Sequence, residues 1–154
     1  MDEVKLYSEA VQYIKIEMGT ELYGIDIKYV DNIVRPQQVT RVPNVAQYIK
    51  GVINIRGEIV PIMSLRLKMG LEEIPETKST RFIIVKLEKY GKIGLIVDAV
   101  KEVVALTEDQ IEKMKYDTND DATHFVVGVG KADGTLVSLL DIYAVTYDKS
   151  MKEE

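Results

Sequence analysis

The chain contains no cysteine and no tryptophan, only two phenylalanines and a single histidine, His124, among its 154 residues. The missing cysteines exclude disulfides, thiolate metal sites and a cysteine nucleophile, and they are typical of a reducing compartment. One histidine cannot form a two-histidine metal site, and His124 has no recognisable catalytic partner in the sequence. We therefore expect no metal, no cofactor and no catalytic residue, and we interpret His124 as an ordinary loop residue.

Charges of one sign do not gather anywhere in the sequence. The 20 Lys and Arg residues are spread among 25 Asp and Glu residues, which gives a net charge of −5. Because no basic cluster could neutralise a row of phosphates, we expect no nucleic-acid partner. No apolar run approaches the ~18 residues of a membrane span, and the N-terminus is acidic where a signal peptide is basic. These absences predict a cytoplasmic protein that does not insert into a membrane.

What the sequence does contain is an internal repeat. Residues 23–34 align without a gap on residues 93–104, and residues 51–65 align on residues 128–142. Gly24 thereby corresponds to Gly94. Val, Ile and Tyr are abundant, as is usual in β structure. Two copies of one small β unit are the simplest interpretation.

We therefore predict a mainly β fold made of two linked five-stranded barrels. The polar segment 72–80, which contains Pro75, is the expected linker. The first strand, near Tyr13, could complete either barrel. The predicted divisions are a flexible arm at 1–10, a first barrel at 11–75, a second barrel at 76–148 and a flexible tail at 149–154.

Alternation of apolar residues and turn signals predict the individual elements. Strands are expected at 12–18, 22–27, 52–56, 59–63, 81–88, 92–97, 126–129 and 136–140. Pro61 lacks an amide hydrogen, so its strand is expected at an edge or a bulge. Helical segments are expected at 26–33, at 45–50 after Asn44, at 64–69 after Ser64, at 107–114 after the Thr107 capping box, and at 141–148 after Asp141.

Differences between the two copies point to residues that the fold does not require. Gly51 and Gly57 recur as Gly128 and Gly134, so we interpret them as backbone necessities. Arg56 instead faces Asp133, which makes Arg56 a candidate for function.

The segment 48–62 contains the run Asn54-Ile55-Arg56-Gly57 before an apolar strand. This run resembles the signature of the CheW family of chemotaxis adaptors, and the resemblance extends over 23–33, 94–111 and 134–142. It covers nearly the whole chain. The resemblance implies two linked SH3-like barrels around a shared interface.

By this resemblance the protein is a scaffold without enzymatic activity, which joins the cytoplasmic tips of transmembrane chemoreceptors to the histidine kinase CheA in bacterial chemotaxis. A receptor helical hairpin would bind in a groove between the barrels, the regulatory domain of CheA would bind barrel to barrel, and all three would assemble into rings or arrays. The receptor-binding residues that it implies are Val30, Asn32, Ile33, Asn54, Arg56, Gly57, Gly94 and Val100. The kinase-binding residues stay unassigned.

Three alternatives stay open. Val30 and Val100 correspond to each other and could simply be core residues, and Arg56 could tie its hairpin to Asp31 or Glu58. The family commonly has a glutamate, thought to pair with the arginine, where this chain has Asn32, and an amide cannot replace the two-pronged contact of a carboxylate. The chain could also be an enzyme or small-ligand-binding protein, which would use polar groups gathered in the cleft between the barrels.

Overall fold

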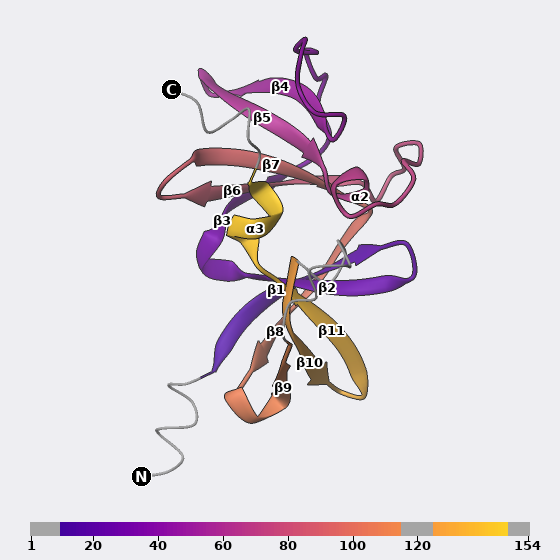
Figure 1. Ribbon diagram of the computed structural model, residues 1–154, viewed down its shortest axis with the longest axis vertical. Coiled ribbons are helices and arrows are strands. Elements are labelled where there is room, and N and C mark those ends of the chain that lie inside the picture. The colour runs from indigo at the N-terminus through magenta and orange to yellow at the C-terminus, as the bar shows by residue number, and fades with distance from the viewer. Residues whose placement is uncertain (1–9, 115–124, 148–154) are drawn as a thin grey trace.

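The computed structural model describes residues 10–114 and 125–147 (Figure 1). His124, the expected tail and nearly all of the expected arm lie outside the described residues. In the described residues, strands predominate, and the few helical segments are short. The predicted fold class, mainly β, is confirmed.

The strands form two curved sheets, which occupy the lower and upper halves of Figure 1. The lower, six-stranded sheet has the order β8 (Ala99–Leu106), β1 (Val11–Met18), β2 (Glu21–Asp26), β11 (Thr135–Leu140), β10 (Val126–Ala132), β9 (Ile111–Lys113). The upper, five-stranded sheet has the order β3 (Val30–Val34), β6 (Arg81–Leu87), β7 (Gly91–Val97), β5 (Glu58–Ser64), β4 (Ile49–Ile55). Both sheets are consistent with SH3-like barrels.

The sheets do not follow the order of the chain. The hairpin of β1 and β2 belongs to the six-stranded sheet, whose other strands come from residues 99–140, and the hairpin of β6 and β7 joins β3, β4 and β5. The predicted division of the strands into two barrels at residue 75 therefore differs from the observed sheets. In each barrel, the first hairpin comes from one sequence copy and the remaining strands come from the other copy. The segment that repeats in sequence is therefore not the segment that forms one sheet. The strand containing Tyr13, left open above, lies in the six-stranded sheet.

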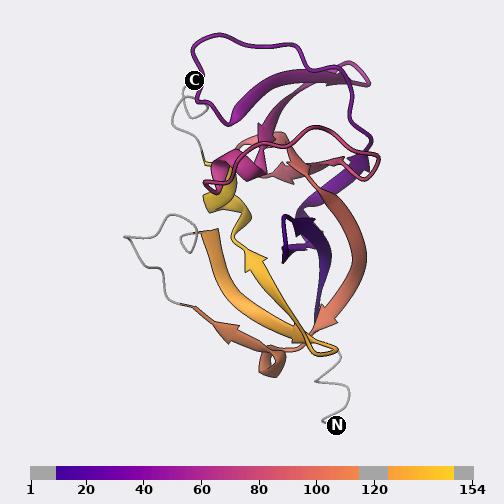
Figure 2. The same cartoon turned by 90° about the vertical axis from the view of Figure 1, so that its right-hand side faces the viewer.

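Exchanging the two copies converts one strand order into the other. The repeat matches β8 to β3, β1 to β6, β2 to β7, β11 to β5 and β10 to β4. When each strand of the six-stranded sheet except β9 is replaced by its match, the strand order becomes that of the five-stranded sheet. The molecule thus has an approximate internal twofold symmetry with exchanged hairpins. Only Asp98 separates β7 from β8, and there the chain passes from one sheet into the other (Figure 2).

The symmetric glycines lie where two parallel strands approach closely. Gly94 on β7 pairs with Ile62 on β5, and Gly24 on β2 pairs with Leu139 on β11. A Cβ atom on Gly94 would stand 2.5 Å from the Cδ1 atom of Ile62, and one on Gly24 would stand 3.0 Å from the Cδ2 atom of Leu139. The shared fold therefore explains both glycines.

The main hydrophobic core lies between the two sheets. It combines fully buried side chains from both of them, including Ile16 and Ile25 from the six-stranded sheet and Ile83 and Leu95 from the five-stranded sheet. Burying one such side chain stabilises the fold by about 1.5–3 kcal/mol. Two smaller clusters, around Phe82 and around residues 137–139, fill the barrels. Because the barrels share one core and exchange hairpins, they form one folding unit.

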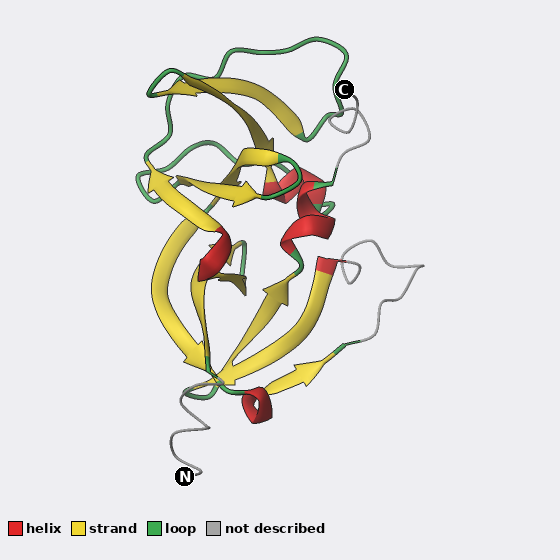
Figure 3. Ribbon diagram, turned by 90° about the vertical axis from the view of Figure 1, so that its left-hand side faces the viewer, coloured by secondary structure: helices red, strands yellow, loops and turns green. Residues whose placement is uncertain are grey.

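Two of the predicted helices are confirmed, with the predicted caps. Helix α2 (Leu65–Lys68) begins after Ser64, whose Oγ atom accepts a hydrogen bond from the Leu67 amide at 3.2 Å. Helix α3 (Ile142–Thr146) begins after Asp141, which accepts a bond from the Ala144 amide at 3.2 Å. The two helices approach each other where Lys68 donates a 2.7 Å hydrogen bond to the carbonyl oxygen of Tyr147 (Figure 3). None of the helices in the described residues is long and apolar enough to cross a membrane.

The other helix predictions were too long or wrong. The Thr107 capping box forms, but it starts only the 3₁₀ turn η2 (Glu108–Gln110), because β9 then pairs with β10. Likewise η1 (Ile27–Tyr29) ends where β3 begins. No helix forms at 45–50, where a turn leads directly into β4. Pro61 lies in β5, between β7 and β4, so its strand is not an edge; the register shift of this pair lies between Ile49 and Gly51.

Candidate functional site

The signature segment forms the turn between β4 and β5. Arg56 has a φ of 53° and Gly57 a φ of 84°, and two consecutive positive φ angles are typical of a type I′ hairpin turn. The Oδ1 atom of Asn54 accepts a 2.9 Å hydrogen bond from the Gly57 amide, which closes the turn. The equivalent turn in the other sheet has a φ of 51° at Asp133 and 78° at Gly134. The backbone is thus common to both copies, and only the side chain of Arg56 is special.

The side chain of Arg56 is exposed and, within the part of the chain that the structure describes, makes no ion pair or hydrogen bond. The carboxylates of Asp31 and Glu58, which were its expected internal partners, are bound to Lys92 instead. The Lys92 Nζ atom lies 3.5 Å from Oδ2 of Asp31 and 3.0 Å from Oε1 of Glu58. The alternative in which Arg56 ties its hairpin to Asp31 or Glu58 is therefore wrong.

Strand β3 carries three of the expected site residues. Val30 packs against the main core, Asn32 is half-buried and pairs with Ile84 of β6, and Ile33 is 39% exposed. A register shift between Val30 and Asn32 sets Asp31 apart from the regular pairing. Since Lys92 contacts both Asp31 and Glu58, β3 lies within reach of the turn at residues 54–57.

Val100 and Gly94 lie away from this turn. Val100 sits on β8 of the six-stranded sheet, pairs with Ile16, and packs against the main core at its partly exposed margin, as its counterpart Val30 does. Both valines therefore serve the core, and both retain an exposed part between the barrels. Gly94 is buried beneath Ile62, so packing alone accounts for it.

A cleft of about 1030 Å³ separates the loop of residues 37–47 from the segment 73–80. Several of its charged groups are paired with one another. Lys50 binds Glu73 at 2.7 Å, and Arg66 binds Asp98 at 2.8 Å. Ser64, which also lines the cleft, is used as the cap of α2.

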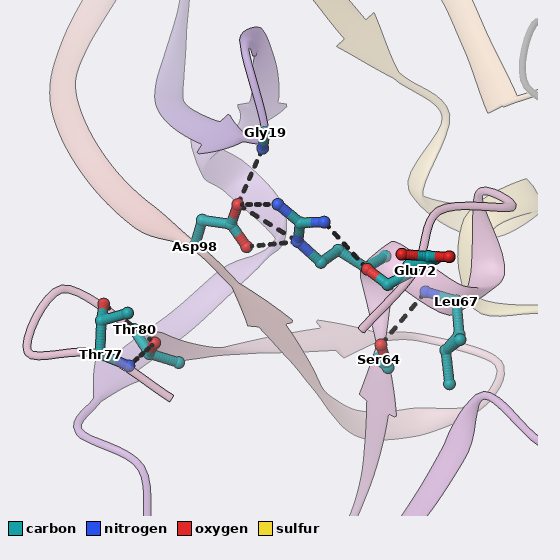
Figure 4. A network of polar contacts seen from close by, with 8 residues as sticks. Gly19, Ser64, Leu67, Glu72, Thr77, Thr80 and Asp98 are labelled. Atoms are coloured by element: carbon teal, nitrogen blue, oxygen red, sulfur yellow. Dashed lines mark hydrogen bonds and ion pairs between the residues drawn. The ribbon is translucent and has the colours of Figure 1, made fainter. Parts of the chain in front are cut away.

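Arg66 is the centre of a network that links both sheets. Its partners Glu72 and Asp98, and Gly19, are labelled in Figure 4. Its guanidinium donates to both carboxylate oxygens of Asp98 and, at 2.9 Å, to the carbonyl oxygen of Glu72. The amide of Gly19, in the turn between β1 and β2, donates to the same carboxylate at 2.8 Å. The hydrogen bond from Arg66 lowers the pKa of Asp98, and the Gly19 amide lowers it further. This network holds the β1–β2 turn to the five-stranded sheet.

These pairings leave no set of groups suited to catalysis in the described residues. No group of three potential metal ligands occurs among them. The side-chain nitrogen and oxygen atoms buried there all have hydrogen-bond partners. Among the described residues of the cleft, no nucleophile is hydrogen-bonded to a base and no ligand cage occurs, so the cleft gives no support to the enzyme alternative.

Sequence analysis missed Lys92, although the repeat could have drawn attention to it. Lys92 is the second residue of β7, and the second residue of β2 is Leu22. Lys92 differs in chemical type from its counterpart in the other copy, and the same kind of difference identified Arg56 as a candidate. The partners of Lys92 could not be foreseen, because they depend on which strands pair.

The chain resembles known proteins in both sequence and structure. Residues 12–150 match the CheW-like domain family. The protein named "Chemotaxis protein CheW" of Klebsiella aerogenes is 34% identical over 151 residues, which cover 96% of this chain and 89% of that protein. The protein of the same name from Helicobacter pylori is 34% identical over 134 residues, covering 87% and 80%.

The crystal structure of the scaffolding protein TtCheW from Thermoanaerobacter tengcongensis superimposes with a TM-score of 0.82 at 32% identity and covers 94% of this chain and 96% of that one. The structural match agrees with the two-sheet architecture, and the family match spans residues 54–57. The chain belongs to the CheW-like family, whose matched members are named as chemotaxis and scaffolding proteins rather than as enzymes.

Proposed function

We propose that this protein is an adaptor that couples the cytoplasmic tips of transmembrane chemoreceptors to the histidine kinase CheA in bacterial chemotaxis. Membership of the CheW-like family supports this proposal. The protein would act in the cytoplasm, recruited to membrane-associated receptor arrays. It would perform no chemistry: shifts of a bound receptor hairpin would reach the kinase through the contacts that the adaptor makes with both partners.

The observation that carries the receptor contact is the exposed, unpaired side chain of Arg56 among the described residues. Its backbone conformation is unfavourable for an arginine, since non-glycine residues at positive φ are mostly Asn or Asp. Folding therefore does not explain why an arginine occupies this position. A guanidinium held clear of internal carboxylates can form a two-pronged contact with a carboxylate of a partner.

The proposed receptor surface combines this turn with the apolar margin between the barrels. It consists of Val30, Asn32, Ile33, Asn54, Arg56, Gly57 and Val100, and Gly94 supports it only through packing. Ile33 and its counterpart Val103 are 39% and 45% exposed, so an apolar side chain emerges from each of β3 and β8. An apolar groove that receives one face of a helix is a recurrent mode of recognition.

For the kinase, a symmetric pair of side chains offers a contact surface. Ile59 on β5 and Leu136 on β11 occupy equivalent positions and are 61% and 60% exposed. Single exposed apolar side chains are common on protein surfaces, so it is the equivalent placement of these two that suggests a site of protein contact. With one such residue on each barrel, the adaptor could contact the regulatory domain of CheA barrel to barrel at either end, which suits assembly into rings or arrays.

The first experiment is a titration of the ¹⁵N-labelled protein with a soluble fragment of a chemoreceptor signalling tip, followed by amide chemical shifts. We expect shifts clustered at Val30, Arg56 and Val100. Arg56→Ala should reduce binding, whereas Asp133→Ala, at the equivalent turn, should leave it unchanged. If a saturating receptor fragment shifts no amide, direct coupling to that receptor is wrong.

A parallel titration with the regulatory domain of CheA tests the second contact. Ile59→Ser and Leu136→Ser should each weaken binding of the kinase domain and leave binding of the receptor fragment unchanged. If both variants bind the kinase domain as the unaltered protein does, the kinase contact lies elsewhere.

A further inference from the structure

Lys92 binds the two carboxylates that flank the proposed receptor surface. Asp31 precedes Asn32 on β3, and Glu58 follows the Arg56-Gly57 turn. One ammonium group contacts both, at 3.5 Å and 3.0 Å. The hydrogen bond with Glu58 raises the pKa of Lys92, so the lysine is charged at neutral pH.

The fold itself does not require this arrangement, because the other copy lacks it. The counterpart of Lys92 is Leu22, which packs against the small apolar cluster inside the six-stranded barrel. The counterpart of Asp31 is Lys101, and that of Glu58 is a threonine. The same backbone is therefore stable without any of the three charges. Like Arg56, they occur in one half only.

The position of Glu58 makes it a natural partner for Arg56. It stands two residues further along the same hairpin, and Asp31 lies close to it, since both contact one nitrogen atom. The long side chain of Arg56 could turn toward either carboxylate, and guanidinium–carboxylate pairs are favourable in geometry. Lys92 and Arg56 thus compete for the same carboxylates, and in this structure Lys92 holds both.

We propose that Lys92 is a positioning residue that occupies Asp31 and Glu58 and thereby leaves Arg56 free for a carboxylate on the partner helix. This inference rests on the proposed function and specifies which chemical group of the receptor Arg56 recognises. It also gives Asn32 a physical role: a carboxylate at that position would provide a third internal acceptor near the turn, whereas an amide does not compete for the guanidinium with a charge.

The free protein provides a first test that needs no receptor. In Lys92→Met, Arg56 should turn to the released carboxylates, and its side-chain Nε–Hε resonance should shift and exchange more slowly with water. Lys101→Met, which removes an exposed lysine at the counterpart of Asp31, is the matched control and should leave that resonance unchanged. An unchanged Arg56 resonance in Lys92→Met would overturn the inference, whatever the receptor titration shows.

Affinity for the receptor fragment provides the second test, measured by calorimetry at fixed ionic strength. Lys92→Met should weaken binding by roughly two- to fivefold, the range expected for exposed ion pairs. The control for the change in charge is the double variant Asp31→Asn/Glu58→Gln, which keeps Lys92. The triple variant, which adds Lys92→Met to these two changes, should bind the receptor fragment as tightly as this double variant does.

The outcomes separate this inference from the proposed function. If the unaltered protein does not bind the receptor fragment, the proposed function fails and the Arg56 resonance still tests the role of Lys92. If the unaltered protein binds but Lys92→Met binds equally well, Lys92 does not position Arg56. If affinity falls and is not restored when the carboxylates are removed, Lys92 contacts the receptor itself, and the inference is overturned.

Discussion

Arg66 and Tyr143 are the second residues of α2 and α3, and so they occupy equivalent positions in the two copies, yet their surroundings differ completely. Arg66 forms a charged network with Asp98 and with the turn at Gly19, and this network ties one hairpin to the opposite sheet. The counterpart of Asp98 is Lys28. At this position the first copy therefore has a cation where the second copy has an anion.

At the corner around Tyr143, tyrosines take the place of the ion pair. Tyr143 packs edge-on against Tyr29, with ring centres 5.9 Å apart, and lies 6.4 Å from Tyr90. Lys28 stands over the ring of Tyr29 at 5.2 Å. The backbone keeps both corners in the same place, while the contacts that close them changed from ionic to aromatic. Side chains at equivalent positions are thus free to diverge wherever the backbone does not restrict them.

At one pair of equivalent glycines, Gly51 and Gly128, the backbone itself differs between the copies. The largest effect that we predict is at Gly51, which has a φ of 144° and would place a Cβ atom against the backbone carbonyl of Thr40. Backbone cannot move aside as a flexible side chain can. Gly51→Ala should therefore lower the free energy of unfolding by about 3 kcal/mol or more, or prevent folding.

The counterpart Gly128 provides the comparison. It has no positive φ, and its Cβ atom would stand 3.0 Å from the Cγ2 atom of Ile111 and 3.1 Å from the backbone oxygen of Glu112, both looser contacts than that of a Gly51 Cβ atom with the Thr40 carbonyl. Gly128→Ala should cost about 1 kcal/mol. Urea denaturation of both variants measures the difference, and equal losses would mean that both glycines are under the same constraint.

A smaller and more symmetric effect is expected at the parallel strand pairs. Gly94→Ala and Gly24→Ala should each destabilise the protein by about 1–3 kcal/mol, with the larger loss at Gly94, where the contact with Ile62 is closer. The Cδ1 atom of Ile62 makes this contact, so Ile62→Val should partly restore stability in the Gly94→Ala background. Thermal unfolding tests this, and a further loss of stability in the double variant would refute the steric explanation.

The charged corner should respond to acid, and the aromatic corner should not. The pKa of Asp98 is lowered in the folded protein, so its stabilisation is fully present above the ordinary carboxylate pKa of about 3.9 and is lost as the pH falls through the lowered value. Asp98→Asn should cost about 1–2 kcal/mol at neutral pH. The difference from the unaltered protein should disappear on acidification below pH ~4.

Tyr143→Leu is the matched change in the second copy. Its loss of stability, about 0.5–1.5 kcal/mol for the aromatic contacts, should stay constant over the same pH range. Unfolding by urea at several pH values compares the two variants. A constant loss for Asp98→Asn would show that the network does not depend on the charge of the carboxylate.

Sequence patterns predicted the local features that a residue controls by itself. Ser64 and Asp141 cap their helices because their side chains reach amides three residues away, and the Arg56-Gly57 turn follows from its spacing. The exchange of hairpins could not be predicted, since the alignment of the copies is identical whether a hairpin pairs within its own copy or with the other. The contacts of Lys92 depend on that pairing and stayed hidden for the same reason.

The smallest predicted effect separates stability from function at the two equivalent turns. Arg56 and Asp133 both have a φ near 50°, a conformation in which Asn and Asp are favoured over other side chains. Arg56→Asn should therefore stabilise the protein, by about 0.5–1 kcal/mol, while it weakens binding of the receptor fragment. Asp133→Arg should lose a similar amount of stability and leave binding unchanged. Denaturation measures the stability of both variants, and calorimetry measures their binding of the receptor fragment. A gain in stability in Arg56→Asn would indicate that the arginine is kept for binding. A loss of stability would mean that the arginine serves the fold.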